Sequence, residues 1–281
     1  AAAAAAAAAV PVPQYFVTQA TRAGLVPTAE AVAPSYWADT TRAGVGKLIG
    51  VSADDYLAMQ SMVNSTFKAV KTRDRKADNP IPKALRVFGV RRNENPALWE
   101  RYARGRHGVK ASHGHRCTKA EGYGGPILTH AGLPAAVRGS LSAGINEYFL
   151  WHGTSPEAAA SICKDGFDLA RSGSATGSMY GPGVYFAECS SKSDEYASSA
   201  GDGIYEGMSC LLLCRVVLGE LHMFTNAGEQ VHPLVKASMG SGQYNSVLGN
   251  RQAAVGTYRE FVIFQEDQIY PEFVVIYEPQ R

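Results

Sequence analysis

The sequence has little net charge, no long apolar run and no internal repeat. It holds 27 Lys and Arg residues against 25 Asp and Glu, a formal net charge of +2, which argues against a strongly electrostatic nucleic-acid binder. The longest apolar stretch, Cys210–Leu218, is far shorter than the roughly 20 residues that a membrane span needs, and it contains Arg215. We therefore expect neither strong nucleic-acid binding nor a membrane partner.

Cysteine is also scarce. The five cysteines are an odd number spread over 281 residues, and no secretory leader is recognisable. We therefore expect free thiols and a nuclear or cytoplasmic chain. The opening Ala1–Ala9 run is interpreted as backbone of unassigned sequence. A hydrophobic fraction of 46% and a charged fraction of 19% exclude general disorder and predict a sizeable buried core.

No Gly/Ser-rich or Pro-rich linker divides the chain. We predict an N-terminal extension over residues 1–80, containing one helix, and a main domain over residues 81–281. Ser52 reads as the cap of that helix, because apolar residues follow at spacings of three and four. These are Tyr56, Met59, Val63, Phe67 and Val70. The mostly basic stretch Lys71–Lys76, with Asp74 as its one acid, is interpreted as a solvated helix end, with a nuclear signal as the alternative.

The main domain reads as α+β. Leu85–Val90 is a predicted strand, and Asn95 with Pro96 begins a predicted helix that turns Trp99 inward. Gly105–Gly144 is predicted to be a long irregular excursion. From Glu147 onward, short β-rich runs alternate with loops that contain glycine, which excludes a doubly wound parallel sheet. The predicted strands are Tyr148–Trp151, Val184–Ala187, Ser209–Leu218, Phe261–Phe264 and Phe273–Tyr277, and the predicted helices are Thr154–Gly166 and Ser191–Ala200.

Two short pieces of the domain carry residues suited to ligand binding. In Leu150–Thr154 a strand ends in His152 and Gly153 before a helix, and a glycine lets a ligand approach the backbone. Gly181–Ala187 contains Tyr185 and is followed by Lys192, Ser193 and Tyr196. The two tyrosines could offer aromatic faces to a ligand. Taken alone, each piece also fits a structural role.

Two further pieces lie near the end of the chain. Tyr258–Phe264 places the carboxyl group of Glu260 at the start of a very apolar strand, where burial is costly unless the charge has a task. An exposed acid at a strand end is the alternative. Gln268–Phe273 contains a proline and leads into another strand, so it is predicted to be the hairpin partner of Tyr258–Phe264.

In this order and spacing, the four pieces closely resemble the catalytic domain of the poly(ADP-ribose) polymerase family, especially tankyrase-like members. The resemblance covers about Lys83–Tyr277. It implies a split mixed β-sheet of the ADP-ribosyltransferase fold with flanking short helices. It also implies that NAD is the consumed donor, and that ADP-ribose passes to protein acceptors while nicotinamide leaves.

The resemblance assigns a catalytic set of His152, Tyr185 and Glu260. His152 would hold the adenosine ribose, and Glu260 would be the catalytic glutamate. Elementary chemistry agrees, because breaking the bond between nicotinamide and ribose develops an oxocarbenium-like cation that a nearby carboxylate stabilises.

The resemblance also implies how NAD is bound. The Gly153 backbone and the Ser193 hydroxyl would hold the nicotinamide amide, and Tyr196 would stack on its ring. Thr154 and Asp168 fall where the family contacts adenosine, although Asp168 replaces a more typical basic residue. The loop Arg171–Tyr180 would cover the donor. The full set of implied NAD contacts is His152, Gly153, Thr154, Asp168, Tyr185, Ser193 and Tyr196.

Several departures from the family shape the functional prediction. Tankyrases carry a zinc-binding insertion where Ala197–Ser209 has neither Cys nor His, so no metal is expected. Only one clear helix precedes the domain, so we expect no strong activation by DNA breaks.

Chain elongation is the leading prediction. Besides the catalytic set, the acceptor-side loops at about Glu220–Thr257 decide whether one unit or a polymer is formed. The alternatives are a mono-ADP-ribosyltransferase, a catalytically silent NAD or ADP-ribose binding module, and an RNA 2′-phosphotransferase, which needs a basic groove.

Overall fold

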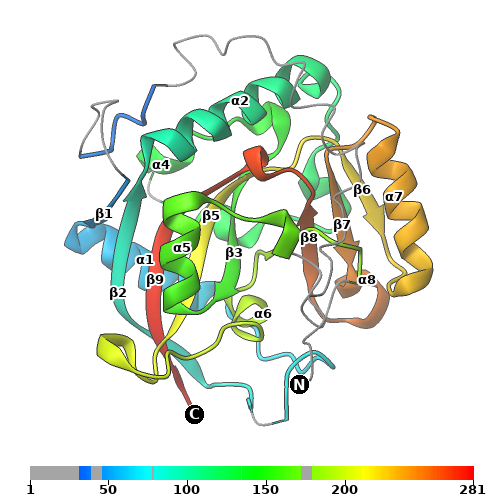
Figure 1. Cartoon of the computed structure of the whole chain (residues 1–281). Coiled ribbons are helices and arrows are strands. Elements are labelled where there is room, and N and C mark those ends of the chain that lie inside the picture. The colour runs from blue at the N-terminus through cyan, green and yellow to red at the C-terminus, as the bar shows by residue number, and fades with distance from the viewer. Residues whose placement is uncertain (1–31, 39–45, 78, 134, 172–178) are drawn as a thin grey trace, which may run out of the picture.

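The computed structural model describes residues 32–38, 46–77, 79–133, 135–171 and 179–281, built around one nine-stranded sheet (Figure 1). The strand order is β1-β2-β9-β5-β3-β4-β8-β7-β6. Among the pairs within these ranges, only β6 and β7 run parallel. The strands are β1 (Lys47–Gly50), β2 (Ala84–Glu94), β3 (Glu147–Thr154), β4 (Val184–Ala187), β5 (Ser209–Val217), β6 (Leu221–Phe224), β7 (Ser246–Asn250), β8 (Arg259–Ile263) and β9 (Ile269–Gln280).

Helices cover both faces of the central strands. In Figure 1, α5 lies in front of these strands and α1 behind them. Residues of α1 pack against Phe149 and Leu211, whereas residues of α5 pack against the next residue of each strand, Leu150 and Leu212. Since successive side chains of a strand point to opposite faces, α1 and α5 cover different faces. The helices are α1 (Ala53–Ser65), α2 (Pro96–His113), α3 (Leu128–Ala131), α4 (Ala135–Gly139), α5 (Pro156–Asp165), α6 (Ser190–Asp194), α7 (His232–Gly240) and α8 (Arg251–Val255).

The sheet is split between β3 and β4. These two strands are joined by a single residue pair, Trp151 with Ala187. The end of β3, which carries His152 to Thr154, continues to pair with β5 on its other side. The mixed, open sheet with several helices confirms the predicted α+β class. Because of the split, the backbone of His152 forms no regular strand pair with β4.

Local capping signals predicted three helix starts correctly. The side chains of Ser52, Asn95 and Ser155 each accept a hydrogen bond from the backbone N–H three residues later. At the end of α5, Gly166 has a φ of 91°, a conformation that favours glycine. These interactions lie within one turn of a helix, so the local sequence contains all the information needed to predict them.

The expectations that depended on distant parts of the chain were less accurate. The predicted hairpin between the last two pieces is wrong, because β9 pairs with β2 and β5, whereas β8 pairs with β4 and β7. The excursion Gly105–Gly144 is partly helical, since α2 continues to His113. The helix predicted over Ser191–Ala200 ends at Asp194. The sequence did not predict β1, β6, β7, α7 or α8.

The segment before the main domain packs onto it. β1 pairs with β2, and Met59, Met62 and Val63 of α1 are buried in the core. The boundary between residues 80 and 81 stays a prediction. All five cysteines are free. Among the helices of the described ranges, none is both long and apolar enough to cross a membrane.

Candidate active site

His152, Tyr185 and Glu260 lie on three neighbouring strands. They come from β3, β4 and β8, and β4 lies between the other two in the sheet. In the register of β4 and β8, Ala187 opposes Glu260 and Tyr185 opposes Val262. Opposed residues share a face, and so do residues two apart, so the side chains of Tyr185 and Glu260 point to the same side of the sheet.

The Glu260 carboxyl group is almost completely buried, with the residue only 4% exposed. A cation, Lys192 of α6, lies beside it, with its Nζ 3.5 Å from Oε1. Burial raises the pKa of Glu260; Lys192 partly opposes this, and the Asp74 carboxylate adds to it. Glu260 is therefore a carboxyl group held in a charged but water-poor setting, which is typical of catalytic acids and bases.

The half-buried His152 side chain contacts β4 directly. Its Nδ1 lies 3.0 Å from the backbone oxygen of Tyr185, and its ring packs edge-on against Phe167. A carbonyl oxygen only accepts hydrogen bonds, so Nδ1 carries the hydrogen of the neutral ring. Burial lowers the pKa of His152, which favours that neutral form. The Nε2 atom is then left as an acceptor, suited to a sugar hydroxyl.

The Tyr185 hydroxyl holds the turn that leads into β4. It accepts a hydrogen bond of 2.8 Å from the backbone N–H of Tyr180 and donates one of 2.9 Å to the oxygen of Gly181. Burial raises the pKa of Tyr185, so the phenol stays neutral. Because its hydroxyl is committed to this turn, Tyr185 can offer a ligand the face of its ring.

Gly153 lies directly against the backbone of α6. A Cβ atom placed on Gly153 would lie 1.8 Å from the carbonyl oxygen of Ser193, closer than any real contact. The close approach of β3 and α6 therefore requires glycine here. It places the Gly153 backbone beside Ser193, the two residues that the family resemblance assigns to the nicotinamide amide.

Replacing Gly153 by Ala is therefore expected to push β3 away from α6. We expect a loss of stability of about 1–3 kcal/mol, the range for an overpacked site, together with weaker binding of nicotinamide-like inhibitors. Thermal unfolding and inhibitor titration would measure the two effects. As a control, Gly108→Ala should have neither effect, because no atom lies within 4 Å of a Cβ at that helical position. Unchanged inhibitor affinity in Gly153→Ala would contradict the assigned contact.

The remaining predicted contacts differ in their surroundings. Tyr196 follows α6 and is 40% exposed, so its ring is accessible to a ligand. Thr154 is half-buried and ends β3. Asp168 is exposed, and its side chain accepts a hydrogen bond from the backbone N–H of Ala170, so it shapes its own turn. Residues 172–178 of the predicted donor loop lie outside the described residues. The NAD contacts assigned by resemblance stay predictions.

Three charged residues that meet at this site were not predicted from the sequence. Lys192 follows the Gly181–Ala187 piece, but no role was predicted for it, and none was predicted for Glu195. Asp74 was assigned to a solvated helix end, which is wrong: α1 ends at Ser65, and the side chain of Asp74 bonds to Lys192 and Tyr196. No spacing signal in the sequence could have placed Asp74 there, because 118 residues separate it from Lys192.

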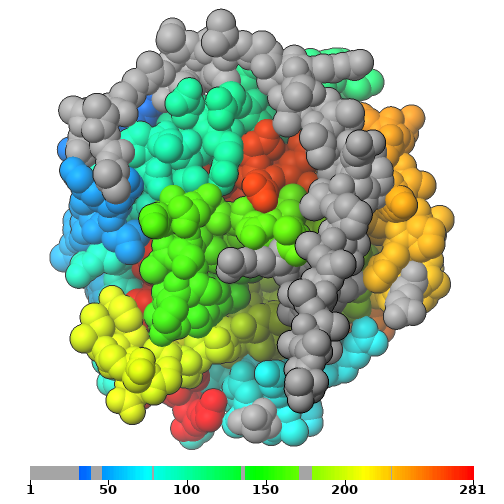
Figure 2. Space-filling model, viewed as in Figure 1, coloured from blue at the N-terminus to red at the C-terminus, as the bar shows by residue number. Residues whose placement is uncertain are grey.

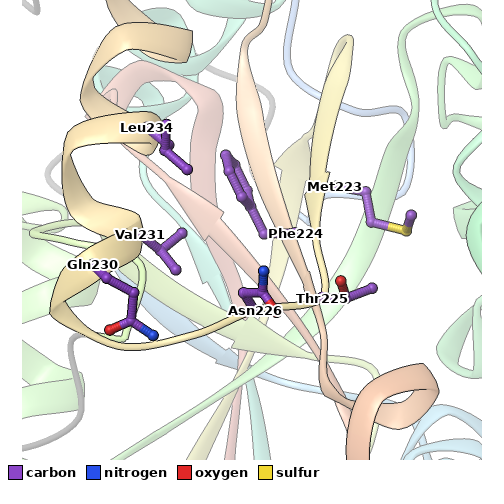
Figure 3. A pocket seen from close by; sticks show the side chains of 7 residues that line it. All are labelled: Met223, Phe224, Thr225, Asn226, Gln230, Val231 and Leu234. Carbon is purple, nitrogen blue, oxygen red and sulfur yellow. The ribbon is translucent and has the colours of Figure 1, made fainter.

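A cavity of about 240 Å³ lies beside the edge strand β6, within the predicted acceptor-side loops. Figure 3 shows Phe224 between this strand and the residues Val231 and Leu234, with Asn226 and Gln230 at one end. Phe224 and Val231 also pack in the cluster that contains Tyr180 and Tyr185.

No group of three or more His, Cys, Asp or Glu side chains in the described ranges could hold a metal ion.

Comparison with known proteins agrees with this geometry. The family model of the poly(ADP-ribose) polymerase catalytic domain matches residues 64–278. Poly [ADP-ribose] polymerase 2-A of Oryza sativa subsp. japonica is 31% identical over 153 residues, 46% of this chain and 23% of the rice protein. Protein mono-ADP-ribosyltransferase PARP12 of Homo sapiens is 32% identical over 133 residues, 47% of this chain and 17% of the human protein. Poly [ADP-ribose] polymerase tankyrase of Caenorhabditis elegans is 30% identical over 104 residues, 37% of this chain and 4% of the worm protein.

The open mixed sheet with its flanking helices is consistent with the catalytic fold of an ADP-ribosyltransferase. Since the family model covers most of its length, this chain belongs to the poly(ADP-ribose) polymerase catalytic domain family. The chain spans less than a quarter of the length of each of these three relatives.

Proposed function

We propose that this chain transfers ADP-ribose from NAD to protein acceptors, releases nicotinamide, and extends poly(ADP-ribose) chains. The observation that carries the proposal is the buried Glu260 carboxyl group, which shares a sheet face with Tyr185 of β4. β4 in turn lies beside β3, the strand that carries His152. The family resemblance implies the same roles for these three residues.

The chemistry asked of each residue follows from its surroundings. The His152 acceptor nitrogen and the Gly153 backbone hold the two ends of the donor, which fixes the ribose between them. Glu260 accepts a hydrogen bond from the ribose hydroxyl next to the reacting carbon. Its negative charge then stabilises the cation that develops as nicotinamide leaves. When a chain is extended, the same carboxylate orients the hydroxyl of the incoming ADP-ribose unit.

Single transfer is the second candidate. The human relative in the comparison is named as a mono-ADP-ribosyltransferase, and it is as similar to this chain as the rice polymerase. The difference between one unit and a polymer depends on how the acceptor side receives another ADP-ribose. In this chain that side contains the cavity beside β6. An intact Glu260 favours elongation, because the acceptor hydroxyl needs a base.

Incubation of the purified chain with NAD labelled in its adenylate part tests the proposal. A high-molecular-weight smear on a denaturing gel would support chain elongation. A single sharp labelled band would leave transfer in place and replace elongation by single transfer. If NAD binds but no label is transferred and no nicotinamide is released, the chain is a silent NAD-binding module and the proposal fails.

A further inference from the structure

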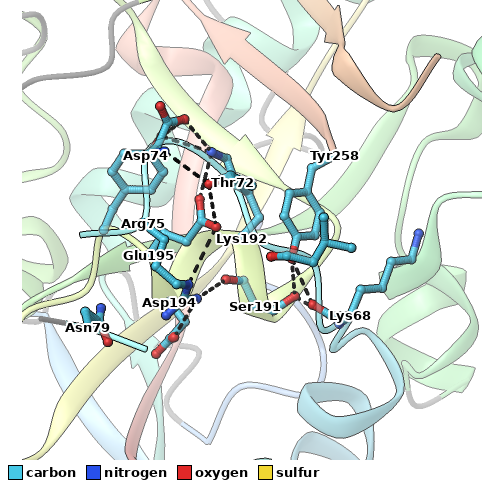
Figure 4. Close-up of polar contacts among 12 residues, drawn as sticks. Lys68, Thr72, Asp74, Arg75, Asn79, Ser191, Lys192, Asp194, Glu195 and Tyr258 are labelled. Carbon is cyan, nitrogen blue, oxygen red and sulfur yellow. Dashed lines mark hydrogen bonds and ion pairs between the residues drawn. The ribbon is translucent and has the colours of Figure 1, made fainter. Parts of the chain in front are cut away.

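A segment from the N-terminal part of the chain, which we call the crossing segment and which runs from Lys68 to Arg75, packs against α6 and reaches the candidate active site. Figure 1 shows it as the cyan loop directly below α6, and in Figure 2 it forms part of the surface at the lower edge of the molecule. Tyr258, two residues before Glu260, donates a hydrogen bond to the backbone oxygen of Lys68. Arg75 donates to the Asp194 carboxylate and to the Ser191 oxygen of α6 (Figure 4).

These contacts hold Asp74 over the charged centre of the site. Its Oδ2 atom lies 3.0 Å from the Nζ of Lys192 and 3.0 Å from the hydroxyl of Tyr196. The Asp74 side chain is 15% exposed, whereas those of Lys192 and Glu195 are almost fully buried. Asp74 is therefore the outer member of a buried network whose inner members belong to α6 and the residues that follow it.

Lys192 has more acceptors around it than it has hydrogens. A lysine ammonium group has three N–H donors. The neighbours at 3.0 Å are Asp74 Oδ2, Glu195 Oε2 and the Tyr196 hydroxyl. Glu260 Oε1 lies at 3.5 Å, beyond a normal hydrogen-bond length. The Glu260 carboxylate thus feels the charge of Lys192 without receiving one of its short hydrogen bonds.

We propose that Asp74 is a positioning residue for the transfer reaction: it holds the Lys192 ammonium group and the Tyr196 hydroxyl, and thereby keeps the Glu260 carboxylate free for the hydroxyl of the ribose. The proposal rests on the proposed function and extends the active site to a segment outside the four sequence pieces. Without the Asp74 charge, a Lys192 hydrogen becomes available to Glu260 and competes with the substrate.

The charges around Glu260 determine the expected direction of change. Lys192 faces Glu260 from α6, Glu195 faces it from the residue that follows α6, and Asp74 faces it from the crossing segment. The phenol groups of Tyr180, Tyr185 and Tyr196 also lie near Glu260. Arg73 and Arg251 act on Tyr180 from further out. Burial raises the pKa of Glu260, Lys192 lowers it, and Asp74 raises it again. Neutralising Asp74 removes one raising influence and leaves the lowering influence of Lys192, so we expect the pKa of Glu260 to fall.

The test compares Asp74→Asn with Asp202→Asn, a matched control in which the same charge is removed from an exposed residue. The Glu260 carboxyl group is titrated by NMR of side-chain-labelled glutamate, with its signal identified by its loss in Glu260→Gln. We expect the Glu260 midpoint to fall by about one pH unit in Asp74→Asn, a modest response to a nearby charge. The control should keep the wild-type midpoint, and Asp74→Glu should restore most of it.

Kinetics provide the second measurement. In Asp74→Asn we expect kcat for nicotinamide release to fall about tenfold, with the KM for NAD within about threefold, because the substrate contacts remain. The acid limb of the kcat profile should move to lower pH together with the NMR midpoint. An unchanged midpoint in Asp74→Asn, or an equal shift in Asp202→Asn, would overturn the proposal. A wild-type chain without any transfer would refute the proposed function, and the titration would still decide whether Asp74 controls Glu260.

Discussion

Replacing Glu260 by Gln is expected to reduce nicotinamide release and ADP-ribose transfer by about 10²–10³-fold, the range for removing one preorganised charge-stabilising group. Glutamine keeps the size of the buried side chain and removes only the charge that we propose to stabilise the developing ribose cation. NAD affinity should change by no more than a few-fold, because the proposed contacts of His152 and Gly153 with the donor remain. Nicotinamide release under saturating NAD and calorimetric NAD binding measure the two effects separately.

Glu278→Gln is a suitable control for this experiment. Glu278 lies near the end of β9, its side chain is 48% exposed, and it pairs with Arg86 at the surface. We expect this variant to retain full activity. If Glu260→Gln lost NAD binding as strongly as it lost transfer, Glu260 would be a donor-binding residue and its catalytic assignment would be wrong.

Replacing Arg215 by Leu is expected to cost about 3–5 kcal/mol of folding stability, the range for breaking a buried ion pair by removing one partner. Arg215 lies in β5, between β9 and β3, and its side chain is only 1% exposed. Its guanidinium group pairs with Glu272 of β9 and, at 3.1 Å, with Glu147 of β3. Both carboxylates are fully buried, so the variant would leave them without the cation that they share.

Urea unfolding followed by tryptophan fluorescence would measure this loss. The control is Arg86→Leu, which breaks the Arg86–Glu278 pair of two half-exposed side chains. Surface pairs contribute about 0–1 kcal/mol, so the control should change stability by no more than that. If both variants lost the same small amount, the Arg215 cluster would be no more important for stability than a surface ion pair.

The helix starts show which parts of the fold the sequence could predict. Asn95 with Pro96, and Ser155 with Pro156, begin α2 and α5 as expected, because a cap interacts with backbone atoms only three residues away. The predicted β4 matches the observed strand from Val184 to Ala187. β6 and β7 were missed because each is short and its burial depends on neighbours in space.

Pairing between distant strands was the main source of error. The last two strands are close in the sequence, which favoured a hairpin. In the structure, β9 instead pairs on both sides along most of its length with β2 and β5. The apolar residues of β9 thereby join the central core on both faces, with Val274 in one cluster and Val275 in the other. This gain in buried surface is not visible from sequence neighbours alone.

The sequence by itself determined the family, the α+β class and the order of the pieces that carry His152, Tyr185 and Glu260. These features could be recognised because each depends on a short local pattern of residues. Only the tertiary structure decided which charges surround Glu260. Lys192 comes from α6, and Asp74 comes from a segment 118 residues earlier in the chain than Lys192. The reason is physical: electrostatic interactions depend on distance in space and on burial, and the sequence order of these residues specifies neither.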